Sequence, residues 1–267
     1  MNRLLWTRRA ALSLASAALL AACGGMAPKP ADTEIVMMTS GGFAAASDEL
    51  KPGFERSTGY RVKTVYGSSM GGASDSIPSR LARNEPVDVV ILARSSLDQL
   101  VAQGKVVPGS QVDIVHSLIG FAVKKGAPKP DISTPEAVKR ALLAAPSIAY
   151  SASASGTYYE TEMLKNLGIE AEVKPKSKRI LSERVATVVA RGDAALGLQQ
   201  VSELIPIPGA DFVGVLPPPL QRVTVFSAGI STSSKNPEAA RALIRYYISA
   251  DAAPTIRKAG LEPAPVK

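Results

Sequence analysis

The segment from Tyr66 to Ile91 constrains the fold of this chain more than any other, because it combines a strand end, a turn of small residues and a helix. After Tyr66 come glycines, serines and Met70, and then Ile77 and Leu81 recur at helical spacing. A helix that begins behind such residues directs unpaired N–H groups and hydroxyl donors at one point, where an anion can bind. An ordinary turn between a strand and a helix would use the same residues.

Two other segments repeat this order of strand, small-residue turn and helix. A strand over residues 34–38 runs into Thr39 and Ser40, and a strand over 147–150 runs into three alternating serines and Gly156. Ser40 is also a good helix cap, so a capping role alone is an alternative there. Strands that alternate with helices predict a parallel sheet of the α/β class.

We expect a small anion to bind where these junctions meet, because ligands of open α/β sheets lie outside the carboxyl ends of the strands. Gln199 and Gln200 follow a later predicted strand over 195–198 and offer both donors and acceptors, although a surface position alone would explain them. The predicted ligand-binding residues are Ser40, Gly41, Ser68, Ser69, Met70, Arg80, Arg83, Ser151, Ser153, Ser155, Gly156, Gln199 and Gln200.

Two strands are predicted to carry the chain between lobes. From Val112 to Val123 the chain is almost continuously apolar, which predicts two strands or one long bent strand that crosses between lobes. A strand over 223–229 would return the chain to the first lobe. The single histidine, His116, lies in the first of these segments, where a hydrogen-bonded core residue is a commoner role than a catalytic base.

The first residues have the pattern of an export signal. Arg3, Arg8 and Arg9 precede an uncharged run over 10–22, which is too short for a stable transmembrane helix. Because the single cysteine, Cys23, follows a Leu-Ala-Ala sequence, we predict that residues 1–22 are a lipoprotein signal peptide and that Cys23 is lipidated. A plain secretory signal is the alternative. Residues 23–32 would be a linker, and the protein a periplasmic lipoprotein held at the membrane by its lipid alone.

Charge and composition exclude several classes of partner. Without residues 1–22 the chain has 28 Lys and Arg against 23 Asp and Glu, a modest surplus that is not interleaved with aromatic residues. We therefore predict no nucleic-acid partner. One histidine and one cysteine cannot supply a zinc centre, so no metal site and no cofactor is predicted.

Several longer segments carry a family resemblance that covers residues 33–260. The chain resembles the molybdate-binding-protein-like branch of the type II periplasmic solute-binding proteins in the segments MTSGG, GSSMGG, YSASASGTYYETEMLKNLGI, RVATVVARGDAALGLQQVSEL and NPEAARALIRYYISADAAP. The resemblance implies a two-lobed α/β protein with the periplasmic-binding-protein type II fold and a ligand cleft between the lobes. Lobe 1 would contain residues 33–117 and 224–267, and lobe 2 residues 118–223. It also implies a small anionic ligand and, as a possible partner, an ABC permease.

Within this branch, the segments SMGG, IPSRLARNEPVDVVI, YSASASG and ARGDAALGLQQVSEL look most similar to aconitate isomerase, an exported enzyme built on the solute-binding fold. Molybdate is held mainly by neutral donors, so Arg80 and Arg83 favour a carboxylate ligand instead, for which a guanidinium is a bidentate partner. We therefore expect a di- or tricarboxylate ligand and isomerisation of cis- and trans-aconitate by a 1,3-proton shift. The alternative is a substrate-binding lipoprotein of an ABC transporter for an organic carboxylate or a molybdate-like oxyanion.

No catalytic residue is assigned from the sequence. The reaction needs a group that removes an allylic proton and returns it at another carbon. Several side chains can carry a proton and no spacing selects among them: His116, Tyr158, Tyr159, Glu160 and Glu162.

Overall fold

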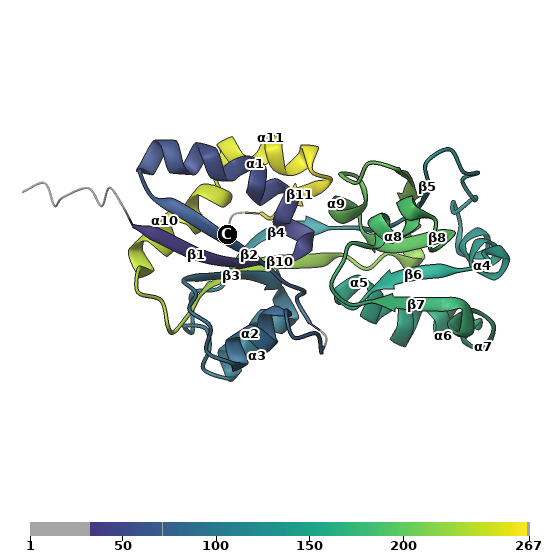
Figure 1. The fold of residues 1–267 in the computed structure, drawn as a ribbon, viewed down its shortest axis with the longest axis horizontal. Coiled ribbons are helices and arrows are strands. Elements are labelled where there is room, and N and C mark those ends of the chain that lie inside the picture. The colour runs from purple at the N-terminus through teal and green to yellow at the C-terminus, as the bar shows by residue number, and fades with distance from the viewer. Residues whose placement is uncertain (1–32, 71, 266–267) are drawn as a thin grey trace, which may run out of the picture.

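A computed structural model describes residues 33–70 and 72–265 of the chain and contains two sheets, each covered by helices (Figure 1). The predicted signal peptide, Cys23 and the predicted linker lie outside the described residues. Within these residues, no helix is long and apolar enough to cross a membrane, and no group of His, Cys, Asp or Glu side chains could hold a metal ion.

The first sheet has six strands in the order β11-β4-β10-β3-β1-β2. Strand β1 is parallel to β2 and β3, which confirms the parallel arrangement predicted from the alternation of strands and helices, whereas β10 is antiparallel to β3 and β4, so the whole sheet is mixed. Strand direction depends on where the chain re-enters the sheet, and a hydrophobic pattern does not contain that information. The strands are β1 (Glu34–Thr39), β2 (Arg61–Tyr66), β3 (Val89–Ala93), β4 (Val112–Ser117), β10 (Thr224–Ile230) and β11 (Leu261–Pro263).

Helices cover both faces of this sheet (Figure 1). On one face lie α1 (Gly41–Thr58), α10 (Pro237–Tyr247) and α11 (Ala253–Lys258), and on the other lie α2 (Ile77–Ala82) and α3 (Arg94–Ala102). Alternate residues of β3 enter the two cores: Val89 and Ile91 pack with α1 and α10, and Val90 and Leu92 pack with α2 and α3. This period of two is what a strand buried on both faces requires.

The second sheet has five strands in the order β7-β6-β8-β5-β9, with β5 antiparallel to its neighbours. Its strands are β5 (Ile119–Lys124), β6 (Ile148–Ser151), β7 (Ser177–Ile180), β8 (Leu196–Gln200) and β9 (Ala210–Val215). Its helices are α4 (Pro135–Ala144), α5 (Ala154–Tyr158), a π-helical turn (Tyr159–Met163), α6 (Leu164–Asn166), α7 (Glu170–Val173), α8 (Val185–Arg191) and α9 (Val201–Leu204). Short 3₁₀ turns lie at Lys174–Lys176, Pro218–Leu220 and Ala250–Ala252.

The chain passes between the sheets twice. The apolar run from Val112 forms two strands, β4 in the first sheet and β5 in the second, and β10 returns the chain to the first sheet, which confirms both predicted crossings. The side chain of Gln221 ties the crossings together, because it accepts from Ile119 N at 2.8 Å and donates to Ile119 O at 3.0 Å. The division into lobes at residues 117/118 and 223/224 stays a prediction.

Candidate functional site

A cavity of about 410 Å³ lies between the two sheets, and its lining comes from the ends of five strands and the segments that follow them. Such a position, outside the carboxyl ends of strands, is where ligands of open α/β sheets bind. Both sheets contribute. The lining residues are Ser40, Gly41, Ala44, Asp48, Tyr66, Gly67, Ser68, Asp75, Ser151, Ala152, Ser153, Ile180, Leu181, Ser182, Glu183, Arg184, Gln199 and Glu203.

The first predicted junction has the expected geometry. Helix α1 begins directly after β1, and Ser40 precedes it with a backbone N–H that donates to Ile91 O at 2.8 Å. The Ser40 hydroxyl makes no capping hydrogen bond, so it is available to the cavity. Helix α1 has 18 residues, and its dipole adds positive potential at Gly41.

The second predicted junction differs from the expectation, because a loop separates Ser68 from helix α2. The helix begins at Ile77, and its N-cap is Ser76, whose side chain accepts from Ser79 N. The N-terminus of α2 is therefore capped by Ser76, and the first N–H of the helix, from Ile77, donates to the carbonyl oxygen of Ser68 at 3.0 Å, so these groups are satisfied within the protein. Of the predicted residues in this segment, Ser68 lines the cavity, whereas Ser69 and Met70 do not.

Ser69 instead supports the cavity wall from behind. Its hydroxyl accepts from Ala93 N at 2.9 Å, and its N–H donates to Ser153 Oγ at 3.3 Å. The second contact connects the segment that follows β2 in the first sheet to the segment that follows β6 in the second sheet. Met70 is engaged through its carbonyl, which accepts from the hydroxyl of Ser68 at 2.7 Å.

The structure does not bring Arg80 and Arg83 to the cavity. Both guanidinium groups bind Glu85, at 2.8 Å and 2.6 Å, and neither arginine is among the lining residues. Residues three positions apart share one side of a helix, so a single carboxylate just after α2 engages both. The arginine of the cavity is Arg184, which precedes α8 and whose guanidinium group makes no hydrogen bond or ion pair with another described residue.

Only two of the four residues predicted at the third junction line the cavity. Ser151 and Ser153 line the cavity, whereas Ser155 and Gly156 lie behind them. The hydroxyls of Ser151 and Ser155 are 3.1 Å apart and hydrogen-bonded. A Cβ atom at Gly156 would lie 1.7 Å from Ser151 O, so only glycine allows this close approach of helix to strand.

Gln199 and Gln200 point to different surroundings. Gln199 lines the cavity, where its Oε1 accepts from Val185 N at 2.9 Å and its Nε2 donates to Glu203 Oε1 at 2.8 Å. Gln200 lies away from the cavity, and its Nε2 donates to Thr224 Oγ1 at 2.9 Å. Adjacent residues of a strand face opposite sides, so only one of the two can face the ligand.

Glu203 is the buried carboxyl group of the site. Its side chain lies in the cavity wall with 8% of its surface exposed, and a Cβ atom at Gly41 would lie only 2.1 Å from its Oε1. Burial raises the pKa of Glu203 from the ordinary 4.5 to about 7, while the nearby positive charge of Arg184 lowers it. Near neutral pH this group can therefore both accept and donate a proton.

The remaining ionisable groups of the cavity are engaged with neighbours. Tyr66 donates to Asp48 at 2.6 Å, and burial followed by this hydrogen bond raises the pKa of Tyr66 to about 12. Asp75 accepts from the hydroxyl of Ser182 at 3.2 Å, which again joins the two halves of the molecule. Glu183 forms an ion pair with Arg191 that lowers the pKa of this carboxyl group.

The proton carriers singled out from the sequence lie elsewhere. None of His116, Tyr158, Tyr159, Glu160 and Glu162 lines the cavity. Tyr158 donates to Leu220 O at 2.8 Å, and Tyr159 shares a hydrogen bond with Ser177 at 2.8 Å. His116 lies in β4, where its partners in the sheet are Val225 and Glu262.

The sequence analysis did not identify Arg184 and Glu203 as residues of the site. Both lie inside the segment RVATVVARGDAALGLQQVSEL, which carried the family resemblance.

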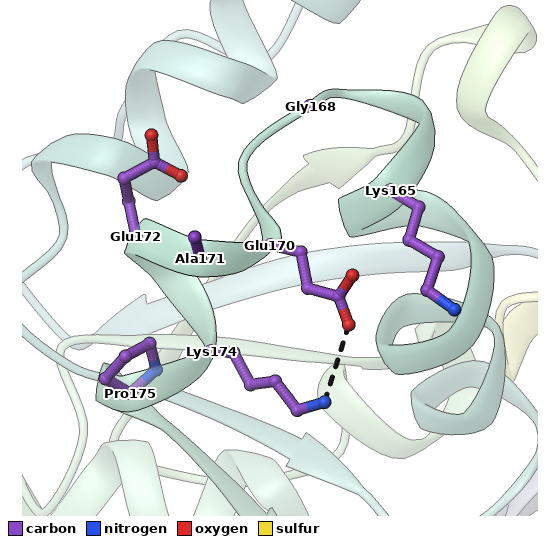
Figure 2. A pocket seen from close by; sticks show the side chains of 7 residues that line it. All are labelled: Lys165, Gly168, Glu170, Ala171, Glu172, Lys174 and Pro175. Carbon is purple, nitrogen blue, oxygen red and sulfur yellow. Dashed lines mark hydrogen bonds and ion pairs between the residues drawn. The ribbon is translucent and has the colours of Figure 1, made fainter.

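A larger hollow of about 760 Å³ lies beside α6 and α7, away from both crossings. Glu170 and Lys174 point toward each other there and form an ion pair at 3.4 Å (Figure 2). The residues shown in the figure come from one continuous stretch, 165–175, whereas the interlobe cavity gathers donors from both sheets. The hollow is therefore a weaker candidate for a ligand site.

Comparisons with known proteins match most of the described chain. The profile of a family described as bacterial extracellular solute-binding protein matches residues 35–262. An aconitate isomerase from Pseudomonas sp is 44% identical over 257 residues, which are 96% of this chain and 95% of that protein.

Solved structures show a similar fold at low sequence identity. The periplasmic molybdate-binding protein of Azotobacter vinelandii superposes with a TM-score of 0.69 at 20% identity, over 87% of this chain and 100% of that one. The sulfate-binding protein of Mycobacterium tuberculosis has a TM-score of 0.65 at 20% identity, over 87% of each chain. The substrate-binding domain of a molybdenum ABC transporter from Clostridium difficile, itself described as putative, has a TM-score of 0.62 at 16% identity. The match covers 87% of this chain and 100% of that one.

Proposed function

Because this chain belongs to the bacterial extracellular solute-binding protein family, we propose that it binds a small polycarboxylate in the interlobe cavity and interconverts cis- and trans-aconitate there. The observation that carries the proposal is a cavity that combines anion donors from both sheets with a buried, protonatable carboxyl group, Glu203. Anion donors alone would suit a receptor. A group that exchanges protons near neutral pH is needed only for a reaction.

Binding of the substrate is supported by the donors that converge on the cavity. Arg184 has an unpaired guanidinium, which can bind one carboxylate through two parallel hydrogen bonds. The hydroxyls of Ser40 and Ser153 stand before the helices α1 and α5 without capping them. All three residues line one cavity and come from segments that follow three different strands, as a ligand with several carboxylates requires. The cavity volume of about 410 Å³ lies within the usual range for small-molecule sites.

The isomerisation follows from the chemistry of the ligand. A proton leaves the methylene carbon beside one carboxylate, and the electron pair spreads over the allylic carbons and the adjoining carboxylates. A proton is then added at the other end of the allylic system, so that the double bond moves and its geometry can change. Arg184 and the helix-terminal donors bind the oxygens on which negative charge increases, which lowers the barrier.

A receptor for a small anion in an ABC transporter is the second candidate function. It is favoured by the hydroxyl donors at Ser40 and Ser153 and by the structural similarity to proteins named for molybdate and sulfate binding. The charged groups of the cavity, Arg184 and Glu203, argue against a molybdate ligand, since molybdate is held mainly by neutral donors.

Export and a lipid anchor complete the proposal. Membership of an extracellular family supports export, and the Leu-Ala-Ala-Cys sequence ending at Cys23 supports lipidation there. Incorporation of labelled palmitate into the chain, and its loss in Cys23→Ser, would test the anchor. Labelling that persists in the variant would disprove it.

The activity is tested by incubating the full chain, purified in mild detergent, with trans-aconitate and measuring cis-aconitate by chromatography. We expect turnover in the unaltered chain and strong loss in Arg184→Gln, with Arg80→Gln as the matched control outside the cavity. Absence of turnover would refute the isomerase. Stabilisation by tricarballylate, a saturated tricarboxylate, would then support a carboxylate receptor, and stabilisation by molybdate alone would support an oxyanion receptor.

A further inference from the structure

We infer that the carboxyl group of Glu203 takes up and returns the proton in the 1,3-shift, and that Gln199 holds this carboxyl group in position. The inference rests on the proposed isomerase activity. Glu203 lies on α9 directly after β8, at the wall of the cavity, and it is the only one of the four cavity carboxyl groups that is buried among the described residues.

The orientation of Glu203 is fixed through a chain of hydrogen bonds that begins at helix α8. The first N–H of this helix, from Val185, donates to Oε1 of Gln199 at 2.9 Å. The amide oxygen of Gln199 is thereby committed as an acceptor, so its NH₂ group faces Glu203 and donates to Oε1 at 2.8 Å. Because Oε1 of Glu203 already accepts, a proton carried by this group resides on Oε2.

The second oxygen of Glu203 is open to the cavity. Oε2 makes no hydrogen bond with another described residue, and it is absent from the buried unpaired side-chain atoms of that part of the chain. Oε2 therefore keeps some accessible surface on a residue that lines the cavity, and we place it toward the space where a substrate would lie. One oxygen is held by the protein and the other is left for chemistry, which is the arrangement that proton transfer needs.

Opposing influences keep both protonation states of Glu203 accessible. Burial favours the neutral carboxyl group, and it raises the pKa to about 7. The charge of Arg184 and the N-terminus of α1 at Gly41, against which the carboxyl group packs, favour the carboxylate. A single residue that first accepts and later donates a proton works best under such a balance.

The other titratable groups that face the cavity are less suited to this role. The carboxyl group of Asp48 accepts a hydrogen bond from Tyr66, and that of Asp75 accepts one from Ser182. Glu183 is exposed and paired with Arg191, which lowers its pKa and makes it a weaker base. The pKa of Tyr66 is raised to about 12, so its hydroxyl does not supply a base near neutral pH.

The proposed step is balanced without another reactant. A C–H bond of the substrate's methylene group breaks as an O–H bond forms on Oε2, and the electron pair enters the allylic system, where Arg184 and the hydroxyls bind the charged oxygens. The O–H bond then breaks, the proton bonds to the opposite allylic carbon, and Glu203 is again a carboxylate. The substrate gains and loses one proton, and nothing is oxidised or reduced.

The first test compares Glu203→Gln with Glu238→Gln, which makes the same change at an exposed site on α10. Glutamine keeps the size of the side chain and an acceptor for Gln199. We expect isomerisation by Glu203→Gln to fall by about 10² to 10⁴-fold, while tricarballylate still raises its melting temperature as in the unaltered chain. Turnover within about tenfold of the unaltered chain would overturn the inference and leave the proposed function intact. Loss of tricarballylate binding would also overturn it, since Glu203 would then serve binding.

The second test separates positioning from general damage to the fold. Gln199→Leu removes the hydrogen bond that favours the charged form of Glu203, so the pKa of Glu203 should rise. We expect the acidic limb of the kcat/KM profile to move to higher pH, whereas a purely structural role would lower the rate without moving the limb. A profile that keeps its shape would overturn the role of Gln199. No turnover in the unaltered chain would overturn the proposed function together with this inference.

Discussion

Glu203→Gln should stabilise the folded protein at alkaline pH, whatever its effect on activity. Folding buries the carboxyl group of Glu203 and raises its pKa from 4.5 to about 7. A group whose folded-state pKa is raised binds protons more tightly in the folded state. It therefore contributes stability that is fully present below pH 4.5 and is lost as the pH rises through about 7. Glutamine has no charge to bury, so this loss disappears in the variant.

The size of the effect follows from the two pKa values. Each pKa unit corresponds to about 1.36 kcal/mol, so the contribution of Glu203 to the free energy of unfolding falls by about 2.5 kcal/mol between about pH 5 and about pH 8. For a chain of this size that difference corresponds to about 5 to 10 °C in Tm. Glu203 has 8% of its surface exposed, so solvent screens the effect little.

Urea unfolding of the unaltered chain and of Glu203→Gln, at about pH 5 and about pH 8, measures the effect directly. Other titrating groups are the same in both, so the change with pH in the difference between the two free energies of unfolding isolates Glu203. We expect this difference to move by about 2.5 kcal/mol in favour of Glu203→Gln as the pH rises. Parallel pH dependences, or a relative gain by the unaltered chain at alkaline pH, would refute the assignment of a buried, reluctantly ionised carboxyl group.

Three other outcomes follow from the geometry of the cavity. Arg184→Gln should weaken tricarballylate binding by about 1.5 to 3 kcal/mol, because it removes a charge-assisted pair, whereas Arg83→Gln should leave binding unchanged; calorimetric titration of both variants compares them. Gly156→Ala should lower the free energy of unfolding by more than about 2 kcal/mol, because the added methyl group would lie 1.7 Å from the carbonyl oxygen of Ser151, and a small loss in chemical denaturation would contradict that contact. The kcat/KM of the unaltered chain should rise as the pH increases through about 7 and then level off, and a pH-independent profile over that range would exclude Glu203 as the base.

The parts of the fold that the sequence predicted well are those set by local chemistry. A threonine followed by proline is a local signal for a helix start, and in the structure Thr134 is the N-cap of α4 with its side chain accepting from Ala137 N. The apolar run from Val112 to Val123 predicted the crossing, because its apolar residues are buried in two successive sheets, Ile114 and Val115 in β4 and Ile119 to Val123 in β5. A helix cap and a continuous apolar run both involve residues that are close in sequence, so they leave a local pattern.

Local sequence patterns could not identify Arg184 as the arginine that lines the cavity. The surroundings are alike for Arg80, Arg83 and Arg184, since each follows a strand and a turn and lies in or next to a helix. What separates them is a partner: Glu85 forms ion pairs with the first two, and the guanidinium group of the third has no partner among the described residues. Whether a carboxylate at position 85 would turn back onto α2 depends on the path of the chain after the helix, which periodicity does not specify.

Glu203 was missed because α9 is too short to have a periodic pattern. The helix has four residues, all buried, and a glutamate in such a segment looks like an ordinary polar surface position. Its burial results from long-range packing: Ser202 donates to Gly42 O at 2.7 Å and fixes α9 against the start of α1. Contacts between residues 160 positions apart leave no trace in a window of sequence.

The free-energy penalty of burying the carboxyl group of Glu203 helps to distinguish an enzyme from a receptor. A receptor needs donors for its anion, and a carboxyl group in the wall repels the ligand when it is charged. Glutamine at position 203 would keep the contact with Gln199, avoid that repulsion and remove a penalty of about 3 kcal/mol above pH 7. A protein that only binds its ligand would therefore be more stable, and would repel its ligand less, with glutamine at position 203. Proton transfer is the one role considered for this cavity in which the acid is required, so the same substitution should produce a more stable protein that binds polycarboxylates and does not turn them over.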